Sequence, residues 1–145
     1  MDEEIVRRLT KTTFTSDVLT HCRLKHFASI ANTSEDYISR LAIGLSVRHG
    51  PIDTEWNVGD CSHDAPPSVS KPKSIRCSTM IKNDILIFAA LISQHQQPEG
   101  YESWRTIFQN HWERGVEILT IIAEGNADWI RVLNLVFTSK YSLTN

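Results

Sequence analysis

A long amphipathic pattern in the last third of the chain constrains the fold most. Between residues 101 and 124, a series of mostly apolar residues recurs at spacings of four, three, four, three and four, namely Trp104, Phe108, His111, Gly115, Ile118 and Ile122. This spacing places the series on one face of a helix and is typical of a seam that packs along another helix. The sequence therefore predicts a helix over 101–124 whose seam makes a helix–helix contact.

Four further helices are predicted, over 16–31, 33–49, 84–96 and 129–137. The second of them is the best defined, because Thr33-Ser34-Glu35-Asp36 has the form of a capping box, with Asp in place of the usual Glu, and Gly50-Pro51 is a common helix stop. The third is apolar nearly all round, which predicts a place at the centre of the core or in a subunit interface.

Two short strands are also predicted. Residues 8–15 are rich in Thr, which favours an extended stretch, and the alternation of Ile75, Cys77, Thr79 and Ile81 with polar neighbours suggests a second strand. The first strand and the two helices after it have the order of a ribbon-helix-helix half, in which two chains pair their strands. Because a lone strand has unpaired edges, pairing with a second chain is expected.

These patterns predict a mainly α fold, a compact helical domain of about five helices with one or two short strands and a ribbon-helix-helix-like N-terminal half. A length of 145 residues suits a single domain over 1–145. We expect a strand-helix-helix half (1–50), a Pro-rich loop (51–73), a strand plus three helices (74–137) and a tail (138–145). No internal repeat is visible in the sequence.

The chain is expected to be cytoplasmic. It opens on the acidic residues Asp2, Glu3 and Glu4, whereas a secretory signal opens on basic ones, and no apolar run approaches the roughly 18–20 residues that a membrane span needs. Its three cysteines form no Cys-x-x-Cys pair and are interpreted as reduced thiols, two of them buried. No membrane partner is therefore predicted.

No catalytic residue, cofactor or metal is predicted. The chain lacks the Gly-rich phosphate-binding loops and the Gly-x-Ser-x-Gly nucleophile motif. The run Asp60-Cys61-Ser62-His63-Asp64 offers donor atoms for a divalent metal, but it has a single Cys-x-His pair in a Pro-rich loop, so a solvated loop is the favoured interpretation.

Basic residues are concentrated in the N-terminal third, although the formal net charge of the chain is −2. From residue 5 to residue 32 there are five Lys or Arg and one Asp or Glu. Scattered basic residues usually form a solvated face, but the strand-helix-helix order favours DNA contact, because a β-ribbon can enter a major groove. The candidate DNA-binding residues are Arg7, Arg8, Lys11, Arg23, Lys25 and Arg40.

Three residues of the seam region are candidate interface residues, namely His111, Arg114 and Gly115. His111 could anchor an interface or contact phosphate, but a buried His with a satisfied hydrogen bond is the more common case. A glycine within a helix costs roughly 1 kcal/mol relative to alanine, so Gly115 indicates a close approach by another backbone or a bulky side chain. Self-association is predicted through the 104–122 seam, the 84–96 helix or both.

Three short motifs, in order along the chain, resemble the DndE family, the small subunit of bacterial DNA phosphorothioation (sulfur-modification) systems. They are Thr33-Ser34 followed by Arg40-Leu41-Ala42-Ile43 and Ser46, then 75–81 leading into the apolar helix, then 111–119, which reads His-Trp-Glu-Arg-Gly-Val-Glu-Ile-Leu. The His-x-x-Arg-Gly segment is the most distinctive. The 51–73 connection is longer than is usual in the family.

The resemblance implies a helical subunit that forms a tetramer, binds DNA (nicked duplex has been suggested for the family) and works beside a cysteine desulfurase, a sulfotransferase-like enzyme and an ATPase. We therefore expect a non-catalytic, DNA-binding accessory subunit that positions duplex or nicked DNA for the other sulfur-modification proteins. Two alternatives stay open, namely a ribbon-helix-helix-type transcriptional regulator and an assembly scaffold with no DNA contact, which the net charge favours.

Overall fold

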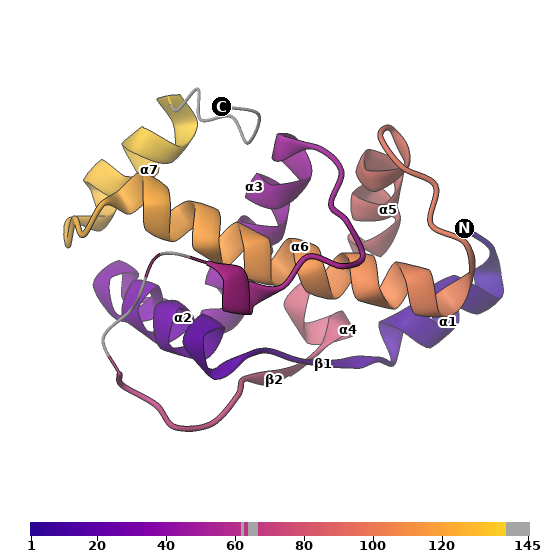
Figure 1. The fold of residues 1–145 in the computed structure, drawn as a ribbon, viewed down its shortest axis with the longest axis horizontal. Coiled ribbons are helices and arrows are strands. Elements are labelled where there is room, and N and C mark those ends of the chain that lie inside the picture. The colour runs from indigo at the N-terminus through magenta and orange to yellow at the C-terminus, as the bar shows by residue number, and fades with distance from the viewer. Residues whose placement is uncertain (62, 64–66, 139–145) are drawn as a thin grey trace.

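The computed structural model describes residues 1–61, 63 and 67–138, and these are mainly helical (Figure 1). They form seven α-helices, one short 3-10 helix and one two-stranded antiparallel sheet. In chain order the elements are α1 (Glu3–Thr10), β1 (Thr13–Thr15), α2 (Val18–Ala31), α3 (Glu35–His49), η1 (Val58–Asp60), β2 (Ser74–Arg76), α4 (Cys77–Met80), α5 (Ile85–Ser93), α6 (Gly100–Ala123) and α7 (Trp129–Thr138). The mainly α class with two short strands is confirmed, with more helices than the five expected.

The first of the additional helices is α1, which replaces part of the extended stretch predicted over 8–15. The Asp2 carboxylate caps it by accepting a hydrogen bond from the Ile5 amide at 2.9 Å. Acidic residues occupy its first turn and basic residues its last, which suits the helix dipole. The extended segment is therefore shortened to Thr13–Thr15.

The second additional helix is the single turn α4, which begins directly after β2. The alternation over 75–81 predicted a strand to Ile81, and this was wrong beyond Arg76. Cys77, Met80 and Ile81 are buried, and their spacing of three and one is also that of one face of a helix. A short apolar run can fit both periods, and here the helical one prevails.

The other predicted helices are confirmed, with small shifts at their ends. Asp17 is the N-cap of α2, and its carboxylate accepts a hydrogen bond from the Leu19 amide at 2.9 Å. The Ser34 hydroxyl caps α3, and Gly50 ends that helix with a φ of 112°, in the region that glycine adopts most easily.

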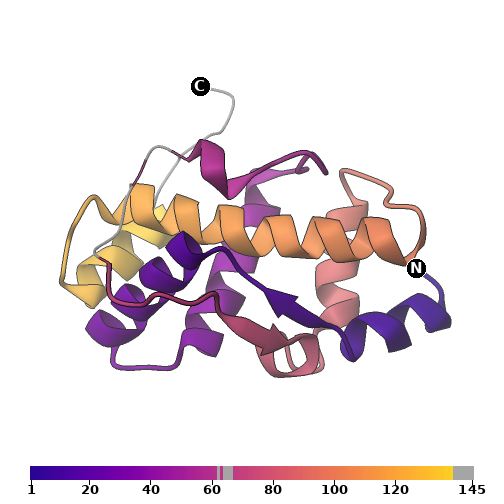
Figure 2. The same cartoon turned by 60° about the horizontal axis from the view of Figure 1, so that its bottom comes forward.

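The order of a strand followed by helices occurs twice in the chain. The first unit is β1, α2 and α3, and the second is β2, the pair α4 and α5, and α6. The two strands pair antiparallel with Phe14 opposite Ile75, and α3 packs against α6 (Figure 2). In addition α2 packs on α6, while α4 and α5 pack on α3. The strand partner that was expected from a second chain is thus supplied by the same chain.

The core is organised around α6, which crosses the molecule from α1 to α7 (Figure 1). Apolar side chains from all seven helices and both strands join one buried cluster, in which Trp112, Phe108 and Phe14 are among the largest members. None of the helices in the described part of the chain combines the length and the apolar character needed to cross a bilayer.

Candidate nucleic-acid interface

The β1–β2 ribbon has one buried face and one polar, exposed face. Phe14 and Ile75, at the centre of the two strands, point into the core. The residues on either side point outward, so that Thr13 and Thr15 of β1 lie opposite Arg76 and Ser74 of β2. Because strand side chains alternate between the two faces, burying the central pair forces these four onto the surface.

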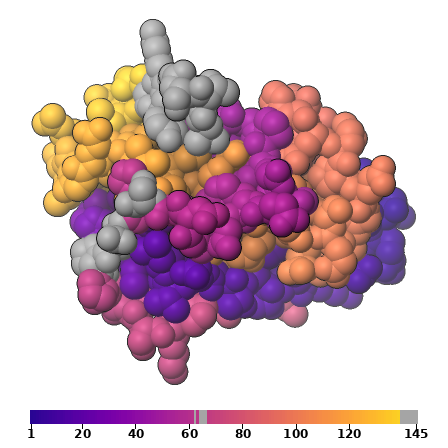
Figure 3. Space-filling model, viewed as in Figure 1, coloured from indigo at the N-terminus to yellow at the C-terminus, as the bar shows by residue number. Residues whose placement is uncertain are grey.

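Strand pairing brings together two basic segments that contain no acidic residue. Residues 5–16 carry three Lys or Arg and residues 67–83 carry four, and neither segment contains Asp or Glu. In the space-filling view of Figure 3, the segment that leads into β2 protrudes at the lower left of the molecule, next to the N-terminal segment. Four of these cations are exposed and form no ion pair with any described residue: Lys11, Lys71, Arg76 and Lys82.

Hydrogen bonds fix the segment that leads into β2. The Ser16 amide donates to the Lys73 carbonyl at 2.8 Å, and the Lys73 amide donates to the Ser16 hydroxyl at 3.0 Å. His21 lies with Nδ1 2.7 Å from the Lys71 carbonyl oxygen and Nε2 3.0 Å from a Glu35 carboxylate oxygen. Helices α2 and α3 therefore hold Lys71 and Lys73 in place beside the ribbon.

Three of the predicted DNA-binding residues lie next to the ribbon, and two of these have partners within the chain. Arg7 forms an exposed ion pair with Glu4. The guanidinium of Arg8 lies over the Tyr101 ring, 3.9 Å from its centre, a cation–π arrangement that anchors α1 to α6. Lys11 is exposed just before β1 and is the residue of the three most open to a phosphate.

Lys25 and Arg40 lie outside the ribbon. Lys25 is exposed on α2, and Arg40 is half-buried on α3, where its Nε donates a hydrogen bond to the Met80 carbonyl at 3.0 Å. This bond fixes Arg40 against the end of α4. Lys25 therefore stays a surface residue, while Arg40 has a part in packing as well.

Arg23 was assigned to DNA contact, and this assignment is wrong. Its side chain is only 1% exposed, and its Nη2 lies 2.6 Å from the Glu117 carboxylate on α6. It also donates to the His63 carbonyl. A buried arginine in a pair of this kind cannot reach a phosphate, and removing either partner would leave a charge in the core. Glu117 therefore balances the charge of Arg23 on the buried face of α2.

Three basic residues near β2 were not among the sequence candidates, namely Lys71, Lys73 and Arg76. Arg76 lies in the alternating stretch that predicted the second strand, and the alternation itself assigns it to the polar face. What the sequence could not supply was the pairing of β2 with β1. This pairing places Arg76 at the same end of the ribbon as Lys11, and Lys71 and Lys73 at the opposite end.

His111, Arg114 and Gly115 lie in a contact within the chain rather than between chains. All three are buried, and they face α3. A Cβ added at Gly115 would lie 1.8 Å from the Ala42 carbonyl oxygen. The close approach that Gly115 predicted is therefore confirmed, but α3 of the same chain makes it, so these residues cannot also meet a second copy.

Arg114 and His111 share the Ser46 hydroxyl. Arg114 Nε donates to that oxygen at 2.8 Å, and the same oxygen lies 2.8 Å from His111 Nδ1. The hydroxyl oxygen can accept from Arg114 while it exchanges a second hydrogen bond with a neutral His111 imidazole. Burial, with Arg114 as a second cause, lowers the pKa of His111 to about 3.

We expect this histidine to make the protein less stable in mild acid. The unfolded chain binds a proton at His111 near the ordinary pKa of 6.5 and the folded chain only near 3, so the free energy of unfolding falls as the pH drops through this range, by at most about 1.4 kcal/mol per pH unit. Urea unfolding at pH 7 and pH 5 should show that His111→Gln loses less free energy of unfolding between the two pH values than the natural chain does. Equal losses would contradict the low pKa of His111. The control is His95→Gln, at an exposed position, which should lose as much as the natural chain.

The 51–73 loop contributes Cys61 and His63 near the Arg23–Glu117 pair. His63 Nδ1 lies 3.2 Å from the Glu117 carboxylate. Burial, and then the Glu117 charge, raise the pKa of the Cys61 thiol. No group of three or more His, Cys, Asp or Glu residues within the described ranges could hold a metal ion. Ser62 and Asp64, which belong to the run considered as a metal site, lie outside the described residues.

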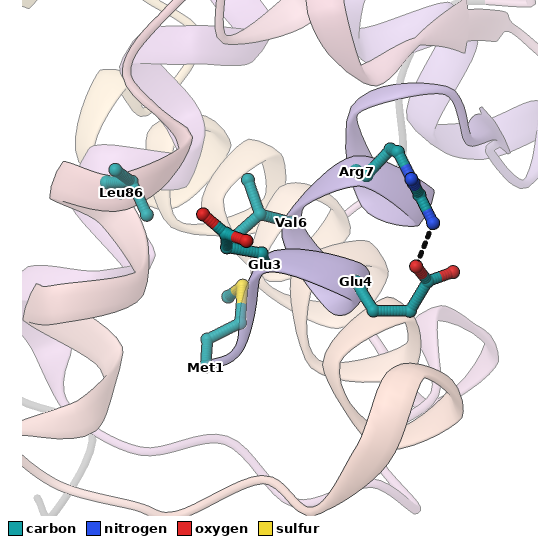
Figure 4. Close-up of a pocket in the computed structure, with 6 residues that line it drawn as sticks. All are labelled: Met1, Glu3, Glu4, Val6, Arg7 and Leu86. Atoms are coloured by element: carbon teal, nitrogen blue, oxygen red, sulfur yellow. Dashed lines mark hydrogen bonds and ion pairs between the residues drawn. The ribbon is translucent and has the colours of Figure 1, made fainter.

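A shallow cavity of about 660 Å³ lies between α1 and α5 (Figure 4). Met1, Glu3, Glu4, Val6 and Arg7 line it from the N-terminal segment, and Leu86 lines it from α5. Its two carboxylates would repel a phosphate, and the guanidinium of Arg7 is paired with Glu4. We therefore do not include it in the interface.

The fold defines a mainly α protein with one exposed, basic, two-stranded ribbon. Comparisons of the chain with protein-family models, curated proteins and solved structures found no match.

Proposed function

We propose that the chain binds duplex DNA through the outer face of the β1–β2 ribbon and acts as a non-catalytic accessory subunit. The observation that supports DNA contact most directly is the pairing of two basic, acid-free segments into one exposed ribbon. Its outward side chains are hydroxyls and a guanidinium, which suit phosphates and base edges. The basic residues of the two segments make this surface positive locally, although the net charge of the chain is −2.

The place of this subunit in DNA sulfur modification rests on the resemblance carried by the three motifs. In this proposal the protein positions intact or nicked duplex, and partner enzymes carry out the chemistry. Arg114 and Gly115, within the most distinctive motif, hold α3 against α6. That motif would thus maintain the geometry of the ribbon rather than touch DNA.

An assembly scaffold is the second candidate, because two helices expose large apolar side chains. Leu86, Ile87 and Leu91 are exposed on α5, as are Ile130 and Phe137 on α7. Exposed apolar residues that gather on a surface are typical of a protein contact. Self-association or partner binding through α5 is compatible with DNA contact at the ribbon, and the natural chain can be tested for both.

Salt-dependent binding to labelled duplex tests the proposal. We expect fluorescence anisotropy to show binding that weakens steeply with salt, because phosphate contacts release counterions. The double variant Lys71→Glu with Arg76→Glu should bind more weakly, and each lost phosphate contact should make the salt slope shallower by about 1. Matched intact and nicked duplexes then test the preference that the resemblance implies.

The control is Arg131→Glu, which reverses an exposed cation on α7, beyond the far end of α6. It should leave affinity within about twofold of the natural chain, since a distant charge is screened beyond roughly 10 Å. An equal loss in this control would indicate a net-charge effect instead of a ribbon contact. Absence of binding at low salt would remove DNA contact by the isolated chain and favour the scaffold.

A further inference from the structure

The ribbon combines features that ribbon-helix-helix proteins obtain from two chains. Both paired strands, and the helices α3 and α6 that pack against each other, belong to one polypeptide. Phe14 and Ile75 form the buried centre of the ribbon, and α3 and α6 cross at Gly115, where the backbone of Ala42 leaves no room for a side chain. The site that would face DNA is therefore complete within one chain.

The two halves of this ribbon are not equivalent. A twofold axis through the Phe14–Ile75 pair would relate Thr13 to Ser74 and Thr15 to Arg76. The first relation joins two hydroxyl side chains. The second joins a threonine to an arginine, so only one end of the ribbon carries a long side chain with several donors.

The polar contacts of the ribbon increase this difference. The Thr15 and Ser74 hydroxyls lie 3.1 Å apart and are hydrogen-bonded to each other, which leaves less capacity for a base edge at that end. Arg76, at the other end, forms no ion pair with a described residue and is exposed. Arginine is the side chain that most often reads guanine in the major groove, through two parallel hydrogen bonds.

Lysines flank both ends of the ribbon. Lys11 precedes β1 at the end that carries Arg76, while Lys71 and Lys73 precede β2 at the opposite end. Phosphate contacts position a protein on a duplex, whereas contacts to base edges carry the sequence information. The lysines that could position the protein on phosphates thus lie at both ends of the ribbon, whereas Arg76, the side chain suited to reading a base, lies at one end only.

We propose that each chain, alone or within an oligomer, binds one DNA site with its own ribbon, and that this site lacks twofold symmetry because Arg76 reads one half of it. This rests on the proposed function, since it requires the ribbon to face DNA. It differs from the two-chain regulator, whose symmetric ribbon selects a palindromic site. The residue that sets specificity is Arg76, and Thr15 is its counterpart in the other half.

Two measurements on the full chain test the proposal. Sedimentation of the natural chain with excess short duplex should give one duplex per chain at saturation. Selection from a randomised duplex library should enrich a motif without dyad symmetry. Arg76→Ala should lower discrimination at the preferred base pair by about tenfold, whereas Thr15→Ala should change it little.

Thr15→Arg gives the sharpest test, because it places an arginine at the position that the twofold axis relates to Arg76. Thr15 is exposed, so the fold should tolerate the change. We expect the selected motif to gain dyad symmetry. A palindrome bound by two chains, or a natural chain that enriches no motif, would overturn the inference. Loss of salt-dependent binding to every duplex would instead count against the proposed function, so the two failures are distinguishable.

Discussion

Replacing Gly115 with alanine is expected to destabilise the fold by about 3 kcal/mol or more. The added Cβ would lie 1.8 Å from the Ala42 carbonyl oxygen and 2.3 Å from its carbon, and these backbone atoms cannot rotate away as a side chain could. Helices α3 and α6 would have to separate along their main contact. The intrinsic helix preference of alanine, worth about 1 kcal/mol, offsets only part of this cost. Urea unfolding followed by circular dichroism measures the change in the free energy of unfolding.

The matched control is Gly44→Ala, which makes the same chemical change in the middle of α3. A Cβ at Gly44 would meet nothing within 4 Å, so only the helix preference acts there. We expect this variant to be more stable than the natural chain by roughly 0.5–1 kcal/mol. If Gly115→Ala were tolerated as well as Gly44→Ala, the close crossing of α3 and α6 would be contradicted.

Sequence periodicity predicted the long helix, the capped helix and the class of fold, because these depend on local patterns. Gly50 ends α3, as its residue type indicates, whereas the N-cap is Ser34 and not Thr33, where the capping-box pattern placed it. Gly115 predicted a close helix contact because glycine destabilises a helix and is tolerated there when a neighbour leaves no room for a side chain. Helix α3 makes that contact. The identity of the partner helix depends on tertiary structure and could not be read from spacing.

The candidate site was only partly predictable. Lys11 and the polar strand residues were found through local composition, but Arg23 was misassigned because its partner, Glu117, is far away in the sequence. The second half of the ribbon, with Arg76, required the pairing of β1 with β2. No sequence repeat marks the two strand–helix units, since both can form with different residues if apolar positions face the shared core.

Arg114 links α6 to the C-terminal end of α3 through several hydrogen bonds. Its guanidinium donates to the carbonyl oxygens of Ser46, Gly50 and Pro51 at 2.7, 2.8 and 3.0 Å, in addition to the Ser46 hydroxyl. Burial lowers the pKa of Arg114 to about 10, which still leaves it charged at neutral pH. A cation at this place is stabilised by the carbonyl groups that end α3 and by the dipole of that helix.

Arg114→Met should therefore cost roughly 3 kcal/mol or more in the free energy of unfolding, because the carbonyls at the end of α3 would stay buried without a donor. Arg114→Lys should recover only part of the loss, since one ammonium cannot reproduce the planar set of donors. Arg105→Met is the control on the same helix. Its side chain is 43% exposed and pairs with Glu102, so its loss should stay within about 0.5 kcal/mol. An Arg114→Met variant as stable as this control would show that other groups satisfy the carbonyls at the end of α3. Arg114 would then not be needed to hold α3 against α6.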